Sequence, residues 1–323
     1  MAEIERIDLK DKRILYELDI NSRRSYSQIG KKVKLPKTVV YYRINSLEKK
    51  GILKNTYALV NFTKLGFMQY KLYLKFHSIN PQKEKEIIDY FINKKKIIWV
   101  SSCRGKWDLT LTLISKDIVE FDRIMKEIID NFGKFILDKD VLIVSYSPLY
   151  SRSYLLPKET KLEFVYMNHI ENKEIDETDE KILKVLSNNS QISILEIMED
   201  LNLTRDLVSY RIKKLERLGI ILCYRSLINL EKIGYHLYKI IFRLQNFSKE
   251  NEESLINYCR AKKNTVQYIR LVGNWDAEIE VEIENEEELY EMIGNIRNRF
   301  DKLIRDYEVL HITEEHKLNF YPL

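Results

Sequence analysis

The sequence predicts an α+β protein in which one unit of helices and strands occurs twice. Two observations support this fold class: the chain aligns with itself after a shift of 168 residues, and each copy passes from helical periodicity to strand alternation. The shift places Gly51 on Gly219 and Gly105 on Gly273, because the members of each pair differ by 168. A constant offset without a gap indicates an internal duplication.

The first third of each copy is predicted to form three short helices. In the first copy, Asp8 or Asp11 is expected to cap the first helix and Ser25 the second, since short polar side chains accept from free backbone N–H groups. Pro36 suits the start of the third helix. Gly51 is expected to end that helix, because glycine adopts the left-handed conformation found after helices.

The remaining two-thirds of each copy contains alternating apolar and polar residues, the pattern of strands with one buried face. In the first copy, the expected strands are Lys71 to His77, the apolar run Ile97 to Val100, Asp108 to Ile114 and Lys139 to Tyr146, and the expected helices are Gln82 to Asn93 and Lys116 to Asn131. This order predicts a β-α-β-β-α-β, ferredoxin-like unit with an antiparallel sheet.

Composition excludes several classes of protein. The chain has 323 residues, 45% of them hydrophobic, which suffices for several packed domains. Its 9 Gly and 5 Pro leave no collagen-like repeat or Gly-rich linker, and neither GxGxxG nor GxxxxGK[ST] occurs. We find no run of ~18 apolar residues and no secretion signal. Cys103, Cys223 and Cys259 lack metal or disulfide spacing, so we expect reduced thiols in a soluble, cytoplasmic protein.

Positive charge is concentrated in the first copy. Residues 1–54 contain 14 basic and 7 acidic side chains, a net +7, whereas residues 175–225 contain 8 and 9, a net −1. The whole chain carries +5. We therefore expect any polyanion to be held mainly by the first copy.

Three short helices with a turn before the third predict a helix-turn-helix DNA-binding fold. Such a third helix enters the major groove with one face anchored on its core and the opposite face on the bases. The anchoring face consists of Val40, Ile44 and Leu47. The residues predicted to bind DNA are Lys37, Thr38, Tyr41, Tyr42, Arg43, Asn45, Lys49, Arg205, Ser209, Tyr210, Arg211 and Lys213. The alternative is a solvated helical face, which the occurrence of the pattern in two copies makes less favoured.

These residues resemble a known family. The segment from Leu35 to Leu53, LPKTVVYYRINSLEKKGIL, resembles the recognition helix of Lrp/AsnC transcription regulators, and the segment from Leu203 to Ile221 resembles it more closely. Thr204 stands where those regulators often have Ser or Thr, whereas Pro36 removes that hydroxyl group from the first copy. The resemblance extends over nearly the whole chain except residues 151–174.

The resemblance implies two winged helix-turn-helix domains and two ligand-sensing and assembly domains in one chain. Two subunits of the family pair through their sensing domains, so this chain is expected to be a covalent pseudo-dimer that binds two half-sites of double-stranded DNA. The half-sites need not match, because Asn45 corresponds to Lys213 and Thr38 to Asp206. Asp206 is expected either to accept from a cytosine amine or to face away from DNA.

Two Gly-x-Trp-Asp turns allow two interpretations. The resemblance places a small-molecule effector, such as an amino acid, near such turns, between associated dimers. The turns would then contribute the effector-binding residues Gly105, Trp107, Asp108, Gly273, Trp275 and Asp276. The favoured alternative is structural: the glycine relieves a tight turn while the tryptophan packs on the sheet.

Two other functions are considered. Paired domains of this kind also resemble siroheme decarboxylases, but His77 and His236 do not occupy equivalent positions, so no matched catalytic pair is visible. The second possibility is an assembly or sensing protein in which only one head binds DNA. We expect no catalytic residue, metal site or cofactor, and we expect self-association through the ferredoxin-like domains.

The predicted domain boundaries follow from these assignments. Helix-turn-helix domains are expected at 1–55 and 175–225, ferredoxin-like domains at 56–150 and 226–323, and a linker at 151–174. Within the linker, Leu162 to Met167 is expected to form an added strand.

Overall fold

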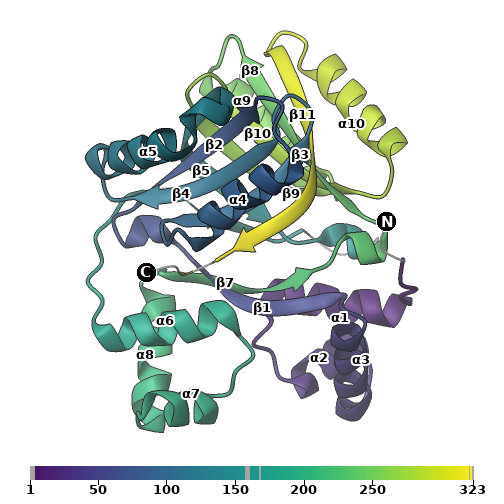
Figure 1. Ribbon diagram of the computed structural model, residues 1–323. Coiled ribbons are helices and arrows are strands. Elements are labelled where there is room, and N and C mark those ends of the chain that lie inside the picture. Colours follow the sequence, from purple (N-terminus) through teal and green to yellow (C-terminus); the bar gives the residue numbers. More distant parts are fainter. Residues whose placement is uncertain (1–3, 157–160, 167–168, 320, 322–323) are drawn as a thin grey trace.

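Two three-helix heads lie beneath a closed β-barrel, and a two-stranded ribbon separates the heads from the barrel (Figure 1). The computed structural model describes residues 4–156, 161–166, 169–319 and 321. Helices and strands follow in the order predicted for a duplicated α+β chain, and the predicted fold class is confirmed.

Each head is three helices around a small apolar core. The helices are α1 (Leu9–Asn21), α2 (Tyr26–Val33) and α3 (Lys37–Lys49) in the first head, and α6 (Glu177–Asn188), α7 (Ile194–Leu201) and α8 (Arg205–Arg217) in the second. As predicted, Asp8 and Ser25 cap α1 and α2, each within a reciprocal capping box. Gly51 follows α3 with φ of +67°, the conformation predicted for it.

Each head packs on the strand of the other copy. Strands β1 (Leu53–Val60) and β7 (Ile221–Ile228) pair antiparallel to form the ribbon, with α1 against β7 and α6 against β1. The heads meet at Ser22 and Ser190, residues separated by 168, whose hydroxyl groups are hydrogen-bonded at 2.6 Å. The copies are therefore exchanged around a pseudo-two-fold axis, and neither head can be removed without exposing the other copy's strand.

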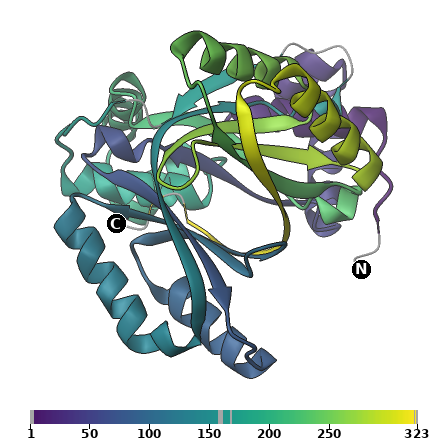
Figure 2. The same ribbon diagram turned by 90° about the horizontal axis from the view of Figure 1, so that it is seen from above.

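The barrel strands come equally from both copies. They are β2 (Met68–Phe76), β3 (Ile97–Arg104), β4 (Leu109–Ser115) and β5 (Ile136–Tyr150), and their equivalents β8 (His236–Leu244), β9 (Thr265–Val272), β10 (Ala277–Ile283) and β11 (Ile304–Leu318). Outside the barrel, α4 (Pro81–Asn93) and α5 (Ile118–Phe132) cover one side, and α9 (Lys249–Ala261) and α10 (Glu286–Arg299) cover the other (Figure 2). Each copy thus forms the predicted ferredoxin-like unit.

Two strand pairings between the copies close the barrel. The order of the larger sheet is β2-β4-β3-β11-β8-β10-β9-β5-β6, and β2 also pairs with β5, so every strand of this sheet except β6 (Glu163–Tyr166) belongs to the ring. The pairings β3–β11 and β5–β9 join the copies, and we call them the two seams. Because closure pairs these strand edges, the ring itself leaves no open edge.

The glycines of the Gly-x-Trp-Asp turns lie at the seams. A Cβ on Gly105, where φ is +137°, would lie 2.8 Å from the carbonyl oxygen of Val309 in β11. A Cβ on Gly273, where φ is +149°, would lie 2.7 Å from the side chain of Leu142 in β5. Each glycine therefore lets the turn of one copy approach the last strand of the other.

Two predicted boundaries differ from the structure. The boundary after residue 55 falls inside β1, because this ribbon strand runs without a break from the end of the first head to the chain that enters the barrel. The expected linker contains β6, which pairs with β5, and Leu155 and Leu156 pack in the core of the first head. The added strand expected from Leu162 to Met167 appears as Glu163–Tyr166, while Met167 lies outside the described residues.

We expect Gly105→Ala to lower the free energy of unfolding by ~1–3 kcal/mol, because alanine at this φ is strained and its methyl group meets backbone. Gly294→Ala in α10 is the matched control, since a Cβ there meets nothing within 4 Å. The control should stabilise the chain by ~0.5–1 kcal/mol. Chemical denaturation of both variants measures the difference, and equal stabilities would contradict the close approach at the seam.

Candidate functional site

The outer face of α3 carries aromatic and polar side chains. Tyr42 is 71% exposed and Tyr41 44%, and Thr38 is also exposed. The opposite face, with Val40 fully buried, anchors the helix on the core of the head. The predicted division of α3 into an anchored face and an outward face therefore agrees with the structure.

The second head presents an equivalent helix with different side chains. Tyr210 is 59% exposed, and Arg205, Asp206 and Lys213 are also exposed. Ser209 is half-buried, and its hydroxyl group donates to the carbonyl oxygen of Arg205 at 2.9 Å. Only the tyrosine is common to both outward faces, so the two helices offer different chemistry to a ligand.

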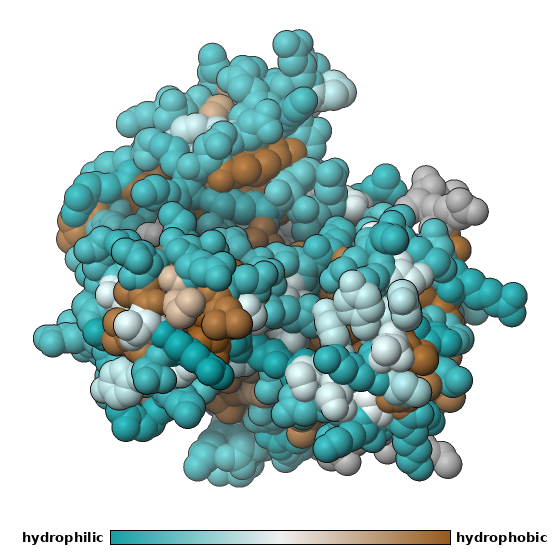
Figure 3. All heavy atoms as spheres, turned by 90° about the horizontal axis from the view of Figure 1, so that it is seen from below, coloured by the Kyte–Doolittle hydropathy of each residue, from teal (hydrophilic) through white to brown (hydrophobic). Residues whose placement is uncertain are grey.

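Lysines surround the outer face of the first head. The exposed lysines are Lys31, Lys32, Lys34, Lys37 and Lys49, and within the described part of the chain none of them forms an ion pair. The second head has Glu199 and Asp200 where the first has Lys31 and Lys32. Seen from below, the two heads form separate lobes, and more apolar surface gathers on the lobe of the second head (Figure 3).

Arg43 and Arg211 hold their own heads together. In the first head, Nη1 of Arg43 lies 2.9 Å from Asp8 and 2.7 Å from Asp11, the two capping residues of α1. In the second, Nη1 of Arg211 lies 2.6 Å from Asp176. These guanidinium groups fasten the recognition helix to the start of the first helix, and a contact with DNA stays a prediction for both.

The Gly-x-Trp-Asp turns face the protein interior. Trp107 and Trp275 are each 1% exposed. The carboxylate of Asp108 accepts from the backbone N–H of Phe76 at 2.8 Å, and that of Asp276 accepts from Leu244 at 2.7 Å. These contacts fit the structural interpretation of the turns, and effector binding by their residues stays a prediction.

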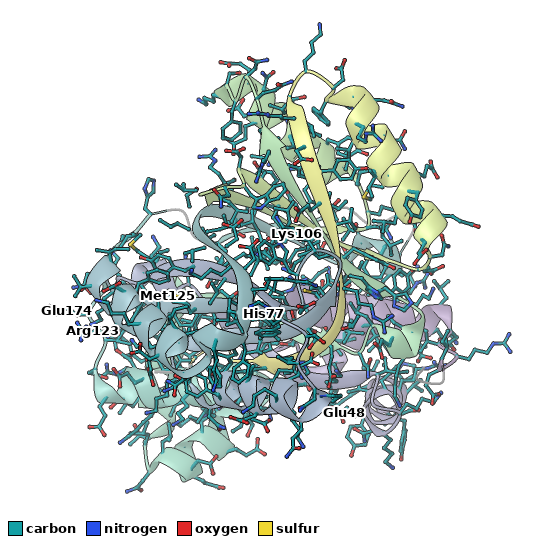
Figure 4. All side chains as sticks on the ribbon, turned by 45° about the horizontal axis from the view of Figure 1, so that its top comes forward. Glu48, His77, Lys106, Arg123, Met125 and Glu174 are labelled. Atoms are coloured by element: carbon teal, nitrogen blue, oxygen red, sulfur yellow. The ribbon has the colours of Figure 1, made fainter. Side chains whose placement is uncertain are left out.

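Charged residues beside these turns also bridge the copies. Lys106 precedes Trp107 and lies close to β11, where its Nζ is 3.2 Å from Glu308 (Figure 4). His77 is exposed at the end of β2, outside the barrel. The structure thus gives the turns a role in joining the copies and leaves His77 apart from the interior.

A buried charged cluster inside the barrel was missed by sequence reasoning. Lys71 and Lys239 are equivalent residues, separated by 168, and their Nζ atoms lie 2.6 and 2.8 Å from the same carboxylate, Glu278. Lys239 also pairs with Glu280, and Tyr73 donates to Glu278. Burial opposes ionisation of Glu278, but Lys239 and Lys71 hold its pKa well below the ordinary value. Lys71 also lies 3.6 Å from Glu280, and burial lowers the pKa of Lys71.

A second buried cluster ties the first head to the barrel. Asp19 of α1 is fully buried, and its carboxylate accepts from Arg225 of β7 at 2.7 Å and from Arg152 at 2.7 Å. Arg152 also pairs with Glu282 of β10 at 2.9 Å. Burial opposes the charge of Asp19, yet Arg225 and Arg152 lower its pKa below the ordinary value. Ser187 occupies the equivalent position in the second head, so this tie exists on one side only.

One sequence signal belongs to these clusters. The run Ala277–Ile283, AEIEVEI, alternates glutamate with apolar residues. Such alternation ordinarily indicates a strand with one face in solvent. Here the glutamate face points into the barrel and meets the lysines of β2 and β8, which sequence alone does not bring together.

Membrane-spanning helices and metal clusters are absent from the described part of the chain. Every helix there is too short or too polar to cross a bilayer. Among the same residues, no three His, Cys, Asp or Glu side chains lie where they could hold a metal ion.

Comparisons with known proteins identify relatives of the two heads and of the overall fold. A family profile described as winged helix-turn-helix DNA-binding matches residues 7–54 and again residues 175–221. The proline dehydrogenase transcriptional activator of Rhodobacter capsulatus is 32% identical over 124 residues, which cover 38% of this chain and 79% of that protein. An uncharacterized HTH-type transcriptional regulator of Pyrococcus horikoshii is 32% identical over 144 residues, covering 44% of this chain and 90% of the relative.

A solved structure matches the chain almost throughout. The crystal structure of the siroheme decarboxylase NirDL covers 97% of this chain and 93% of its own, with a TM-score of 0.63 and 14% identity. At that identity the likeness concerns the fold alone.

We expect Arg43→Ala to lower the free energy of unfolding by up to ~1 kcal/mol, because it removes partly exposed ion pairs at the cap of α1. Lys37→Ala, which breaks no ion pair of the described residues, should leave stability unchanged and weaken binding to duplex DNA several-fold. Denaturation and fluorescence anisotropy measure the two effects. Weakened DNA binding at unchanged stability in Arg43→Ala would assign Arg43 to the DNA instead.

Proposed function

We propose that this chain, which belongs to the Lrp/AsnC family of helix-turn-helix transcription regulators, binds operator DNA with both heads as a covalent pseudo-dimer. It is a DNA-binding transcription regulator. The observation that carries the proposal is the exchange of the two heads on the β1–β7 ribbon, with direct contact between Ser22 and Ser190. This arrangement fixes the distance between two recognition helices, as recognition of two half-sites requires.

The two half-sites are proposed to differ in sequence. The outward faces share Tyr42 and Tyr210, but Asn45 corresponds to Lys213, and Thr38 to Asp206. Asparagine commonly pairs with adenine and lysine with guanine, and each good base contact discriminates by ~1–3 kcal/mol. A single chain can thus recognise an operator that is not palindromic.

The first head is proposed to provide most of the electrostatic affinity. Its unpaired lysines face outward around α3, whereas the second head carries Glu199 and Asp200 at equivalent positions. Lysines that neutralise phosphates release counterions, and this term dominates binding that is independent of sequence. The alternative in which only the first head binds DNA predicts a footprint of one half-site.

We propose that DNA binding responds to a small-molecule effector of the amino-acid class.

We also propose that chains associate further through their ferredoxin-like domains. The barrel helices leave apolar side chains exposed, Ile118 at 61% and Tyr290 at 68%. These residues offer surface for such association. Light scattering of the purified chain tests it, with a mass above one chain as the expected result.

A siroheme-decarboxylase-like enzyme is the second candidate, because the fold covers the whole chain. The interior cavity measures about 190 Å³. A tetrapyrrole is several times larger than the benzene-sized ligands that cavities near 150 Å³ accept. We therefore favour the regulator without catalytic activity. A Soret band retained by the protein after incubation with siroheme and gel filtration would favour the enzyme.

We expect a chain whose first head carries the side chains of the second to select a different operator. The variant is Thr38→Asp, Tyr41→Ser and Asn45→Lys, which copies Asp206, Ser209 and Lys213. Selection from random duplexes should give two unlike half-sites for the unaltered chain and two like half-sites for the variant. Absence of any enriched sequence with the unaltered chain would contradict the proposed function.

We expect the double variant Lys31→Glu, Lys32→Asp, which copies Glu199 and Asp200, to reduce the salt dependence of operator binding. The slope of log affinity against log salt concentration should become shallower by about 2, because each phosphate that a lysine neutralises contributes ~0.9 to it. The reciprocal variant Glu199→Lys, Asp200→Lys is the control and should steepen the slope. Equal slopes for all three chains would show that these positions do not face the phosphates.

A further inference from the structure

The helix before each recognition helix presents a different surface in the two heads. Four exposed positions lie on one side of α2, and the four equivalent positions lie on one side of α7. They form a lysine face in the first head and an acidic face, which includes a leucine, in the second. The equivalent pairs are Ser27 and Leu195, Gln28 and Glu196, Lys31 and Glu199, and Lys32 and Asp200.

The acidic face is unsuited to the place that its helix takes on DNA. In a helix-turn-helix motif, the helix before the recognition helix crosses the phosphate backbone. Carboxylates at Glu199 and Asp200 repel phosphates at that place. Neither side chain forms an ion pair with any described residue, so the chain itself does not neutralise these charges.

Apolar side chains accompany the charges of the acidic face. Leu195 is 55% exposed, and Ile194 and Met198 beside it are half-buried. The first head has Ser27 in place of Leu195 and Gly30 in place of Met198. This difference contributes to the apolar surface on the lobe of the second head (Figure 3). Apolar surface stabilises a contact with protein and gains nothing from phosphates.

The first head offers the complementary surface. Lys31 and Lys32 are exposed, and neither pairs with an acidic side chain of the described residues. At the start of the same helix, the ring centroid of Tyr26 lies 5.6 Å from that of Tyr41. The ring of Tyr42 lies a further 5.6 Å from Tyr41. Two lysines and three aromatic rings thus match two carboxylates and a group of aliphatic side chains.

The charged and apolar groups follow the same order along the two helices. Tyr26 and Leu195 lie in the first turn of α2 and α7, whereas Lys32 and Asp200 lie in the last turn. Two such helices side by side therefore match both kinds of group. Within one chain, α2 and α7 lie in separate lobes, and no ion pair of the described residues joins them (Figure 3). The complementary face must come from a second copy.

We propose that the acidic face of one chain docks on the lysine face and the neighbouring tyrosines of another, and that duplex DNA displaces it. The contact joins unlike surfaces, so it is heterologous and every chain carries both halves of it. The carboxylates of the acidic face take the place of phosphates beside α2. The contact itself does not rest on the function proposed above, whereas its displacement by DNA does.

Sedimentation of the full chain without DNA tests the contact. The chain is expected to associate at low ionic strength, and high salt should weaken the association at least tenfold, because exposed ion pairs are screened. Glu199→Lys, Asp200→Lys should weaken it at least tenfold at low ionic strength. Glu174→Lys, Glu180→Lys changes the net charge equally at exposed positions outside the acidic face and should associate as the unaltered chain does.

A fourfold exchange separates ion pairing from net charge. Lys31→Glu, Lys32→Asp, Glu199→Lys, Asp200→Lys reverses the charges of both faces and leaves the net charge of the chain unchanged. All four positions are exposed, so the variant is expected to fold. It should associate within threefold of the unaltered chain, although each double variant alone does not. Failure of this recovery overturns the pairing of the two helices.

Leu195→Ser, which copies Ser27, tests the apolar part of the contact and should weaken association at least threefold. Leu137→Ser makes the same change at a leucine of β5 that is 58% exposed and should leave the salt-sensitive association unchanged. A chain that stays single at low ionic strength, or an association that no head variant weakens, overturns the proposal. Binding of a lysine-rich peptide by such a single chain would assign the acidic face to another basic protein.

Short random-sequence duplex DNA is then added in excess to the associated chains. Loss of the salt-sensitive association on binding to the duplex supports displacement. Chains that remain joined on the duplex, and separate in Glu199→Lys, Asp200→Lys, contradict displacement and support the contact. A chain that associates through its heads and binds no duplex contradicts the proposed function alone.

Discussion

The structure depends on the reciprocal pairing of β3 with β11 and of β5 with β9. These two pairings turn two open four-stranded sheets into one ring, and they place both sets of helices outside it. Backbone hydrogen bonds across the seams satisfy groups that would otherwise be open edges. The barrel interior and the placement of its helices outside the ring follow from this closure.

Much of the fold could be predicted because the sequence pattern of each helix and strand occurs twice in the chain. The caps of α1 and α2, the stop at Gly51 and the order of the strands are local features, set by side chains within a few residues. The exchange of the heads could not be predicted, since α1 packs on β7 more than two hundred residues away. The 168-residue repeat is equally compatible with heads that pack on their own strands.

The candidate site was predicted in part for the same reason. Helical spacing distinguishes the outward face of α3 from its anchored face, so the exposure of Tyr42 could be predicted from the sequence. The pairing of Arg43 with Asp8 and Asp11 was not, because it joins different helices. The glutamates of β10 resembled a solvent-facing strand, and only barrel closure brings them to Lys71 and Lys239.

The lining of the cavity differs on the two sides of the pseudo-two-fold axis. Thr112 occupies the first-copy position that corresponds to Glu280, and Leu237 corresponds to Gln69. In a dimer of identical subunits, any chiral molecule on the axis has two equivalent orientations, and neither subunit can specialise. Joining the subunits in one chain removes this degeneracy. The interior of this chain therefore has one fixed orientation for every pair of heads, set by side chains that only one copy carries.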